Sequence, residues 1–314
     1  MMLEFLDEIF DVSNVHEKDI FICSVGYEER SYYLLNKFKD RVSSSNILLF
    51  KFEDLVAKTN KSDRIKKENL DGINTISSKY GECQEFFDNV IHFISSKIAQ
   101  DKSINVYIDY SYMPRLWYCR LPFLLKEKVK DIKVSFLYAE GIYPKNYLDY
   151  PSAGIDSLVP YSGKPSLRCH LKRTHIVSLS YDIIRTEGLL SMLDPESIIT
   201  CNAYDPEFRD VYENIVSINE SIISRADYSI SFHLDNFSFM VAKICEVANE
   251  HLPLGDVIII PDGPKPLIFA LSLAGELLKE KHGITCMQIL RSNLEAPVVE
   301  VTPNNKVVSF SIQV

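Results

Sequence analysis

The sequence predicts an α/β protein made of two tandem Rossmann-like units with mostly parallel sheets. Three observations support this fold class. Short apolar runs alternate with amphipathic segments of helix length along the chain. Landmarks of the first half recur in the same order in the second half, and a stretch rich in proline and glycine separates the halves. Alternating strands and helices favour parallel sheets with right-handed crossovers.

The apolar runs are predicted to be buried strands. They are short, nearly continuous and rich in β-branched and aromatic residues, which is typical of parallel strands covered on both faces. In the first half they span residues 20–24, 47–52, 104–109 and 134–139, and in the second half residues 175–178, 198–203, 257–260 and 285–290.

The segments between these runs are predicted to be amphipathic helices. They span residues 31–38, 61–79, 83–99 and 117–129, then 187–193, 206–224, 236–251 and 267–281. The end of the chain has a different pattern. Residues 298–301 and 307–312 alternate in polarity around Pro303, Asn304 and Asn305, which predicts a C-terminal β-hairpin.

The landmarks shared by the two halves predict an internal duplication. Their spacing is nearly constant and far exceeds that of solenoid repeats, so we expect two copies of a domain related by a pseudo-twofold axis. The matched segments are 24–28 with 178–182, 46–48 with 197–199, 114–115 with 264–265, and 132–134 with 284–286. Prolines and glycines concentrate in residues 141–168. We therefore assign residues 1–150 to the first unit, 151–170 to a linker, and 171–314 to the second unit with its hairpin.

Composition excludes several classes of protein. The net charge of −9 argues against a general nucleic-acid surface, because such surfaces neutralise phosphates with basic residues. No apolar run reaches the roughly 20 residues that a membrane span needs. The first residues lack the basic start and apolar core of a signal peptide. We therefore expect a cytoplasmic protein that does not contact a membrane.

The cysteines predict neither disulfides nor a metal centre. Seven cysteines are present, and no two form a CxxC pair, so we expect reduced, mostly buried thiols. Metal sites need clustered ligands, and only Cys169, His170 and His175 lie close together in the sequence. We predict no metal and no other cofactor.

The loop after the first strand is predicted to bind an anion. Ligands of open parallel sheets bind at the carboxyl ends of the strands, and amides at a helix start favour anions. Gly26 would allow a phosphate to approach the backbone, and Arg30 could contact it through two nitrogens. The structural alternative is a surface ion pair between Glu28 and Arg30, with Ser31 capping a helix. The other ligand-binding candidates in this loop are Ser24, Tyr27 and Glu28.

Two further loops combine polar groups with a following helix. After residues 104–109 the chain reads Asp-Tyr-Ser-Tyr-Met-Pro-Arg, from which we assign ligand contacts to Ser111 and Arg115. A cation at a helix start is poorly placed for the helix dipole unless it serves an anion. After residues 257–260, a phosphate cradle is predicted, with a tight turn and an exposed lysine as the alternative. Its candidate residues are Asp262, Gly263 and Lys265.

These loops resemble a known family. A buried strand followed by Asp-Gly-Pro-Lys-Pro (residues 262–266) and an apolar helix resembles the strand-four motif of CARF domains. In the first half, Ser111 and Arg115 match the same motif. Two such units in one chain are similar to SAVED domains. CARF domains are Rossmann-like sensors of cyclic oligoadenylates in prokaryotic antiviral systems. The resemblance therefore implies an antiviral-defence protein that senses a nucleotide or cyclic oligonucleotide.

As a sensor, the chain would bind a phosphate-bearing ligand in a cleft between its halves. Arg30, Arg115 and Lys265 would contact phosphates, and Tyr27 and Tyr181 could stack on bases. No effector region is recognisable in the sequence, so we expect signalling to a separate protein partner encoded in the same operon.

Two other functions stay open. A nucleotide-processing enzyme, either a phosphodiesterase or a glycosidase, would use Glu28 and Asp109 for acid–base chemistry, with Ser24 or Ser111 nearby. A non-catalytic interaction subunit would instead keep the two-unit fold without a ligand. Binding assays would distinguish the interaction subunit, which binds no ligand, from the sensor and the enzyme. Product analysis would then distinguish the enzyme from the sensor.

Overall fold

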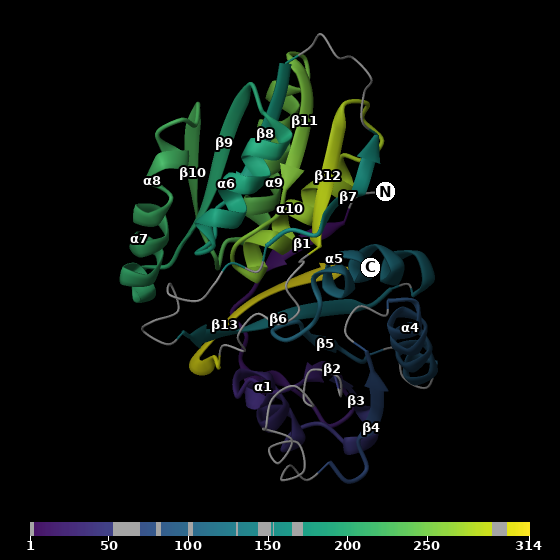
Figure 1. The fold of residues 1–314 in the computed structure, drawn as a ribbon. Helices are drawn as coiled ribbons and strands as arrows, with labels where there is room; N and C mark the ends of the chain where they lie inside the picture. Colours follow the sequence, from purple (N-terminus) through teal and green to yellow (C-terminus); the bar gives the residue numbers. More distant parts are fainter. Residues whose placement is uncertain are drawn as a thin grey trace. The chain divides into compact units, whose positions relative to one another are not determined.

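The computed structural model describes residues 3–52, 70–79, 83–99, 103–129, 131–143, 152, 154–164, 172–290 and 300–314. These residues form an α/β protein with two mostly parallel sheets, one of seven strands and one of six (Figure 1). The chain divides into two compact units. The first holds residues 1–145 and 298–314, and the second holds residues 146–297.

The first unit is built on the seven-stranded sheet. Its parallel strands stand in the order β4-β3-β2-β5-β6, and the antiparallel strand β13 separates β6 from the edge strand β1. The strands are β1 (Glu4–Asp7), β2 (Ile20–Val25), β3 (Ile47–Phe52), β4 (Asn74–Ser78), β5 (Val106–Asp109), β6 (Lys133–Ile142) and β13 (Thr302–Gln313).

The second unit is built on the six-stranded sheet. Its parallel strands stand in the order β10-β9-β8-β11-β12, and β7 pairs antiparallel with β12. The five parallel strands of both units therefore follow the same chain order, and each set ends beside an antiparallel strand. The strands are β7 (Ser157–Lys164), β8 (Lys172–Ser178), β9 (Ser197–Tyr204), β10 (Tyr228–His233), β11 (Gly255–Ile260) and β12 (Ile284–Leu290).

Helices cover both faces of the first sheet. α1 (Arg30–Lys39) packs on the face formed by alternate residues of β2, where Phe21 stacks on Phe38 at 4.0 Å between ring centroids. α4 (Gln84–Ile98) and α5 (Arg115–Lys128) contact each other, and their aromatic side chains pack on β3. Trp117 of α5 stacks on Phe86 of α4 at 3.9 Å and lies 5.5 Å from Phe50 of β3. Burial of these aromatic rings removes apolar surface from water and stabilises this face.

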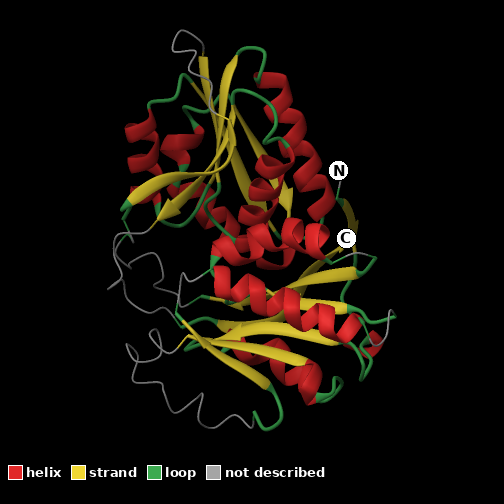
Figure 2. Ribbon diagram, turned by 90° about the vertical axis from the view of Figure 1, so that its right-hand side faces the viewer, coloured by secondary structure: helices red, strands yellow, loops and turns green. Residues whose placement is uncertain are grey.

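The second sheet is also flanked by helices (Figure 2). α6 (Ile183–Leu193) and α8 (Glu220–Ile223) share an apolar cluster in which Leu189, Leu190 and Ile222 meet Val177 of β8. α9 (Phe237–His251) and α10 (Lys265–Leu277) pack against each other, with Phe237 and Phe269 edge to face. α7 (Arg209–Ile218) packs beside β9. Short 3₁₀ turns span Val12–Asn14, Ser44–Asn46 and Pro206–Phe208.

All eight predicted strands are present, each with bounds close to those expected. The helix predicted over residues 61–79 is wrong in its described part, because Asn74–Ser78 forms β4. Residues 61–69 lie outside the described residues. The sequence prediction also missed β1, β7 and β10. β4 and β10 are edge strands with several exposed polar residues, so they lack the apolar run by which central strands are recognised.

The structure does not contain the predicted C-terminal hairpin within residues 300–314. Thr302–Gln313 is one strand, and a register shift against β6 between Pro303 and Val307 takes the place of a turn. Residues 298 and 299 lie outside the described residues. β13 belongs to the first unit, because it fills the position between β6 and β1. The predicted 151–170 linker also holds a strand, since β7 pairs with β12.

Candidate functional site at the strand ends

In both units the order of the parallel strands reverses at one point. It lies between β2 and β5 in the first unit and between β8 and β11 in the second. In open α/β sheets, ligands bind at such a point, at the carboxyl ends of the strands. The sequence-predicted candidates follow these four strands. Ser24–Arg30 and Asp109–Arg115 begin in the last residues of β2 and β5, Tyr181 follows β8, and Asp262–Lys265 follows β11.

In the first unit, the buried Arg30 forms an ion pair with the partly buried Glu28. The Arg30 side chain is 5% exposed and the Glu28 side chain 13%, and Nη2 of Arg30 lies 2.9 Å from Oε2 of Glu28. Nη1 of Arg30 donates to the Tyr138 hydroxyl at 3.0 Å. Burial alone would lower the pKa of Arg30, but Tyr138 and Glu28 hold that pKa above its ordinary value. The pair is therefore part of the interior, rather than the surface pair considered from the sequence.

The start of α1 is tied to the C-terminal segment. The Arg30 amide, the first of the helix, donates to the carbonyl of Val301 at 3.2 Å. Ser31 does not cap the helix, which has no side-chain cap. Its hydroxyl accepts from the Gly26 amide at 3.3 Å and donates to the Glu28 carbonyl at 2.7 Å. Ser31 therefore links Gly26 and Glu28 across the loop. The Gly26 amide, which was expected to face an anion, is already hydrogen-bonded to Ser31.

The two loops of the first unit meet at Gly26 and Tyr112. A Cβ atom on Gly26 would lie 2.2 Å from Cε1 of Tyr112, so only glycine fits against this ring. The rings of Tyr27 and Tyr112 stand edge to face with centroids 5.7 Å apart. The structure thus brings together residues 26, 27 and 112 from two segments more than 80 positions apart, and an aromatic ring fills the space between the loops.

Asp109 organises the second loop. Its Oδ1 accepts from the Ser111 hydroxyl at 2.5 Å and from the Ser111 amide at 2.9 Å, and the same hydroxyl accepts from the Ala139 amide at 2.7 Å. These bonds tie the end of β5 to β6. The two carboxylates considered for acid–base chemistry are held separately, Glu28 by Arg30 and Asp109 by Ser111. Arg115 begins α5 and is half-buried.

Ser24, at the end of β2, is a buried polar group with an unusual environment. It is 1% exposed, and its hydroxyl has no hydrogen-bond partner among the described residues. The Nε atom of Arg30 is in the same situation within that part of the chain. Buried polar atoms usually have partners, so these two call for an explanation.

In the second unit, Arg185 in the first turn of α6 is the centre of a buried polar network. Its Nη2 donates to both carboxylate oxygens of Asp262 at 2.8 Å, and its Nε to Oδ2 at 3.0 Å. Nη1 donates to Asp182 at 2.8 Å, and the Ser180 hydroxyl lies 3.3 Å from Nη2. All four residues are buried. The sequence analysis placed Asp262 in a phosphate cradle, but its carboxylate is bound by this guanidinium. Asp182 at the helix N-cap with an arginine three positions later was the signal that could have revealed the network.

The remaining candidates of the second unit frame a tight turn. Gly263 has a φ of +86°, and a Cβ there would lie 2.4 Å from the Leu179 carbonyl oxygen, so the position requires glycine. Lys265 is half-buried and begins α10 after Pro264, just as Arg115 begins α5 after Pro114. Tyr181 is 37% exposed. Both the tight turn and the lysine at a helix start are therefore present.

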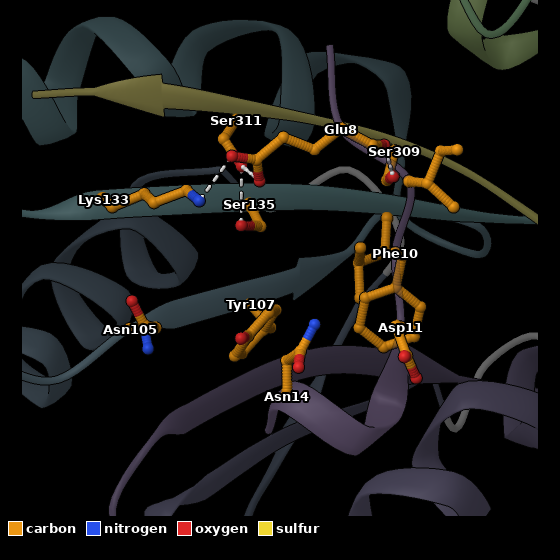
Figure 3. A pocket seen from close by; sticks show the side chains of 12 residues that line it. Glu8, Phe10, Asp11, Asn14, Asn105, Tyr107, Lys133, Ser135, Ser309 and Ser311 are labelled. Carbon is orange, nitrogen blue, oxygen red and sulfur yellow. Dashed lines mark hydrogen bonds and ion pairs between the residues drawn. The ribbon is translucent and has the colours of Figure 1, made fainter. Parts of the chain in front are cut away.

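A separate polar pocket of about 110 Å³ lies in the first unit, near the starts of β5 and β6 (Figure 3). Glu8 is one of the residues that line it, and its carboxylate lies 2.5 Å from Nζ of Lys133 and accepts from the Ser311 hydroxyl at 2.8 Å. Burial opposes the shift, but Lys133 and Ser311 lower the pKa of Glu8. Burial, with the charges of Asp19 and Glu8, raises the pKa of Tyr107 to about 12. The sequence analysis missed this pocket because its residues come from four distant segments.

Among the described residues, no group of three His, Cys, Asp or Glu side chains is placed to hold a metal ion. Cys169 and His170 lie outside those residues. None of the described helices is long and apolar enough to span a membrane.

In comparisons with known proteins, no protein-family model and no curated protein matches this chain.

Proposed function

We propose that the first unit binds a nucleotide-type, phosphate-bearing ligand at the carboxyl ends of β2 and β5. The observation that carries this proposal is the strand order β4-β3-β2-β5-β6, whose reversal brings the loop of Gly26 beside the loop of Tyr112. Through its resemblance to CARF domains, we further propose that the protein is a sensor or accessory protein of a prokaryotic antiviral defence system. It would bind a nucleotide or cyclic oligonucleotide and signal to a separate effector.

The chemistry of the buried groups supports an anionic ligand. Arg30 carries a buried charge that pairs with the Glu28 carboxylate, and its Nε has no hydrogen-bond partner within the described residues. The Ser24 hydroxyl likewise has a proton to donate. Both groups would gain a hydrogen bond from a phosphate or ribose oxygen, and guanidinium groups bind phosphate well.

The two units are also proposed to be diverged copies of one domain. Their parallel strands follow the same order, and an antiparallel strand flanks the last one in each. Pro114 and Pro264 both precede the first residue of a helix, and both adopt an extended conformation, with ψ of 145° and 144°. Only the first copy is proposed to bind the ligand, because Arg185 and Asp262 occupy the matched position of the second.

Isothermal titration calorimetry with ATP, adenosine and cyclic tetra-adenylate tests the binding proposal. We expect at least one phosphate-bearing probe to bind and adenosine to bind far more weakly. Arg115→Ala should weaken binding by about tenfold to a hundredfold, the size of a lost charge-assisted hydrogen bond. Arg120→Ala is the matched control, because Arg120 lies on the same helix and is exposed. Failure of both phosphate-bearing probes to bind the wild-type protein, or equal binding by Arg115→Ala, would refute the proposal.

A further inference from the structure

We infer that Tyr112 is a gate over the ligand site of the first unit. The structure shows the gate closed, and a ligand's planar base displaces the tyrosine ring from Gly26. This inference rests on the binding site proposed above. It adds two features, namely the residue that controls access and the part of the ligand that takes its place.

The Tyr112 ring occupies the space into which a ligand at the strand ends would insert. It lies against the backbone of Gly26, where even a methyl group would clash at 2.2 Å. Tyr27, which is half-buried, presents its ring at right angles to that of Tyr112, and Phe52 at the end of β3 lies 5.9 Å away. Withdrawal of Tyr112 would leave a slot with the thickness of one aromatic ring. Planar bases bind between aromatic side chains in such slots.

Displacement of the Tyr112 ring would break no hydrogen bond of a helix or strand backbone. Tyr112 lies in the loop between β5 and α5, outside both elements, and aromatic rings are among its neighbours. In the second unit, the matched position holds Asp262, which is bound by the guanidinium of Arg185 through three hydrogen bonds. To open the corresponding space in the second unit, the Arg185–Asp262 ion pair would have to separate in a buried environment. The gate is therefore specific to the first unit.

The closed gate lowers the apparent affinity for a ligand. When only a fraction of molecules is open, the apparent dissociation constant rises by the inverse of that fraction. A variant without the tyrosine ring avoids this loss, whereas a variant that keeps the ring retains it. Affinity should therefore respond to the ring itself and not to the tyrosine hydroxyl.

Trp117 provides a reporter that does not depend on the ligand. It is the only tryptophan of the chain and is fully buried. Its ring centroid lies 5.2 Å from that of Phe52, which contacts Tyr112, and it stacks on Phe86 at 3.9 Å. Displacement of Tyr112 would remove packing beside Phe52 and so change the environment of Trp117.

The test compares Tyr112→Ala with Tyr112→Phe, the matched control that keeps the ring. Titration with ATP should show about tenfold tighter binding by Tyr112→Ala if one molecule in ten is open in the wild type. Tyr112→Phe should bind like the wild type. Gly26→Ala, whose new methyl group displaces the ring, should change Trp117 emission without ligand in the same direction as ATP does in the wild type.

The outcomes separate this inference from the proposed function. If the wild type binds ATP but Tyr112→Ala binds no tighter than Tyr112→Phe, the site stands and the gate is refuted. If ATP binds without changing Trp117 emission in the wild type, the gate is refuted as well. If neither the wild type nor either Tyr112 variant binds ATP or cyclic tetra-adenylate, the proposed function fails and the gate fails with it. Should Gly26→Ala not fold, the Tyr112 pair alone decides.

Discussion

The two units close the same topological position with different chemistry. In the first, the Tyr112 ring lies against Gly26, while in the second Arg185 binds Asp182 and Asp262. An aromatic contact is held by dispersion and burial, and it can be replaced by another planar ring. A buried guanidinium between two carboxylates has no such substitute, because separation would leave charges without partners. Strand order therefore brings two loops together at the same point of each sheet, and individual side chains determine the contact that joins them.

The units also complete their sheets from different parts of the chain. In the second unit, the antiparallel strand β7 precedes β8 directly. In the first, β13 comes from the last residues and pairs with both β6 and β1. Its side chains Val308, Phe310 and Ile312 are fully buried or nearly so. The second unit is continuous in sequence, whereas the first depends on both ends of the chain.

Of the changes that test this comparison, removal of residues 298–314 should have the largest effect on folding. We expect the first unit to lose cooperative folding, because β6 and β1 lose their shared partner and Phe136 loses its stacking partner Phe310. The second unit should stay folded. Trp117 emission reports the first unit, and limited proteolysis followed by mass spectrometry should recover a fragment near residues 146–297. A truncated protein with native Trp117 emission would contradict the dependence on β13.

Asp262→Ala should have the next largest effect, on the second unit only. It leaves the Arg185 guanidinium buried with one carboxylate fewer, which typically costs about 3–5 kcal/mol of unfolding free energy. Urea denaturation followed by circular dichroism should show this loss, while the transition of Trp117 should stay in place. The triple variant Asp182→Asn, Arg185→Met, Asp262→Leu should recover most of the loss, because it removes all three buried charges. An equal shift of the Trp117 transition would contradict the independence of the units.

Lowering the pH should cause a smaller loss of unfolding free energy, which again distinguishes the second unit from the first. His175 lies in β8 and Phe21 in β2, which is the first parallel strand along the chain in each unit, and both are fully buried. Burial lowers the pKa of His175 to about 4, and neither ring nitrogen has a hydrogen-bond partner among the described residues. The unfolded chain takes up a proton below its ordinary pKa of about 6.5, but the folded chain does not do so until about pH 4. The free energy of unfolding should therefore fall over this range by about 3 kcal/mol.

The variant His175→Phe tests the cause of that acid sensitivity. It copies the residue of the first unit and should remove the fall in stability between pH 6.5 and 4 that His175 causes. Urea titrations of both proteins by circular dichroism, at several pH values, measure the difference. If both proteins lose the same stability on acidification, His175 is not the source.

Central strands and their helices could be predicted because their residues carry a local signal. β2 and β3 are almost entirely apolar, and the proline at each of positions 114 and 264 marks the start of a helix. β4 could not be predicted because its sequence Asn-Thr-Ile-Ser-Ser resembles a loop, and only pairing with β3 makes it a strand. The long-range partner of β13 was likewise invisible, so its interruption at Pro303–Asn305 was interpreted as a turn.

The sequence by itself determined the alternation of strands and helices and the positions of the loops at the strand ends. These follow from periodicity and from residue types that act over a few positions. Only the tertiary structure decided that Tyr112 faces Gly26, that Arg185 binds Asp262, and that the chain end returns to the first sheet. The physical reason is that partners for buried charges, rings and edge strands are selected by distance in space, which local sequence does not encode.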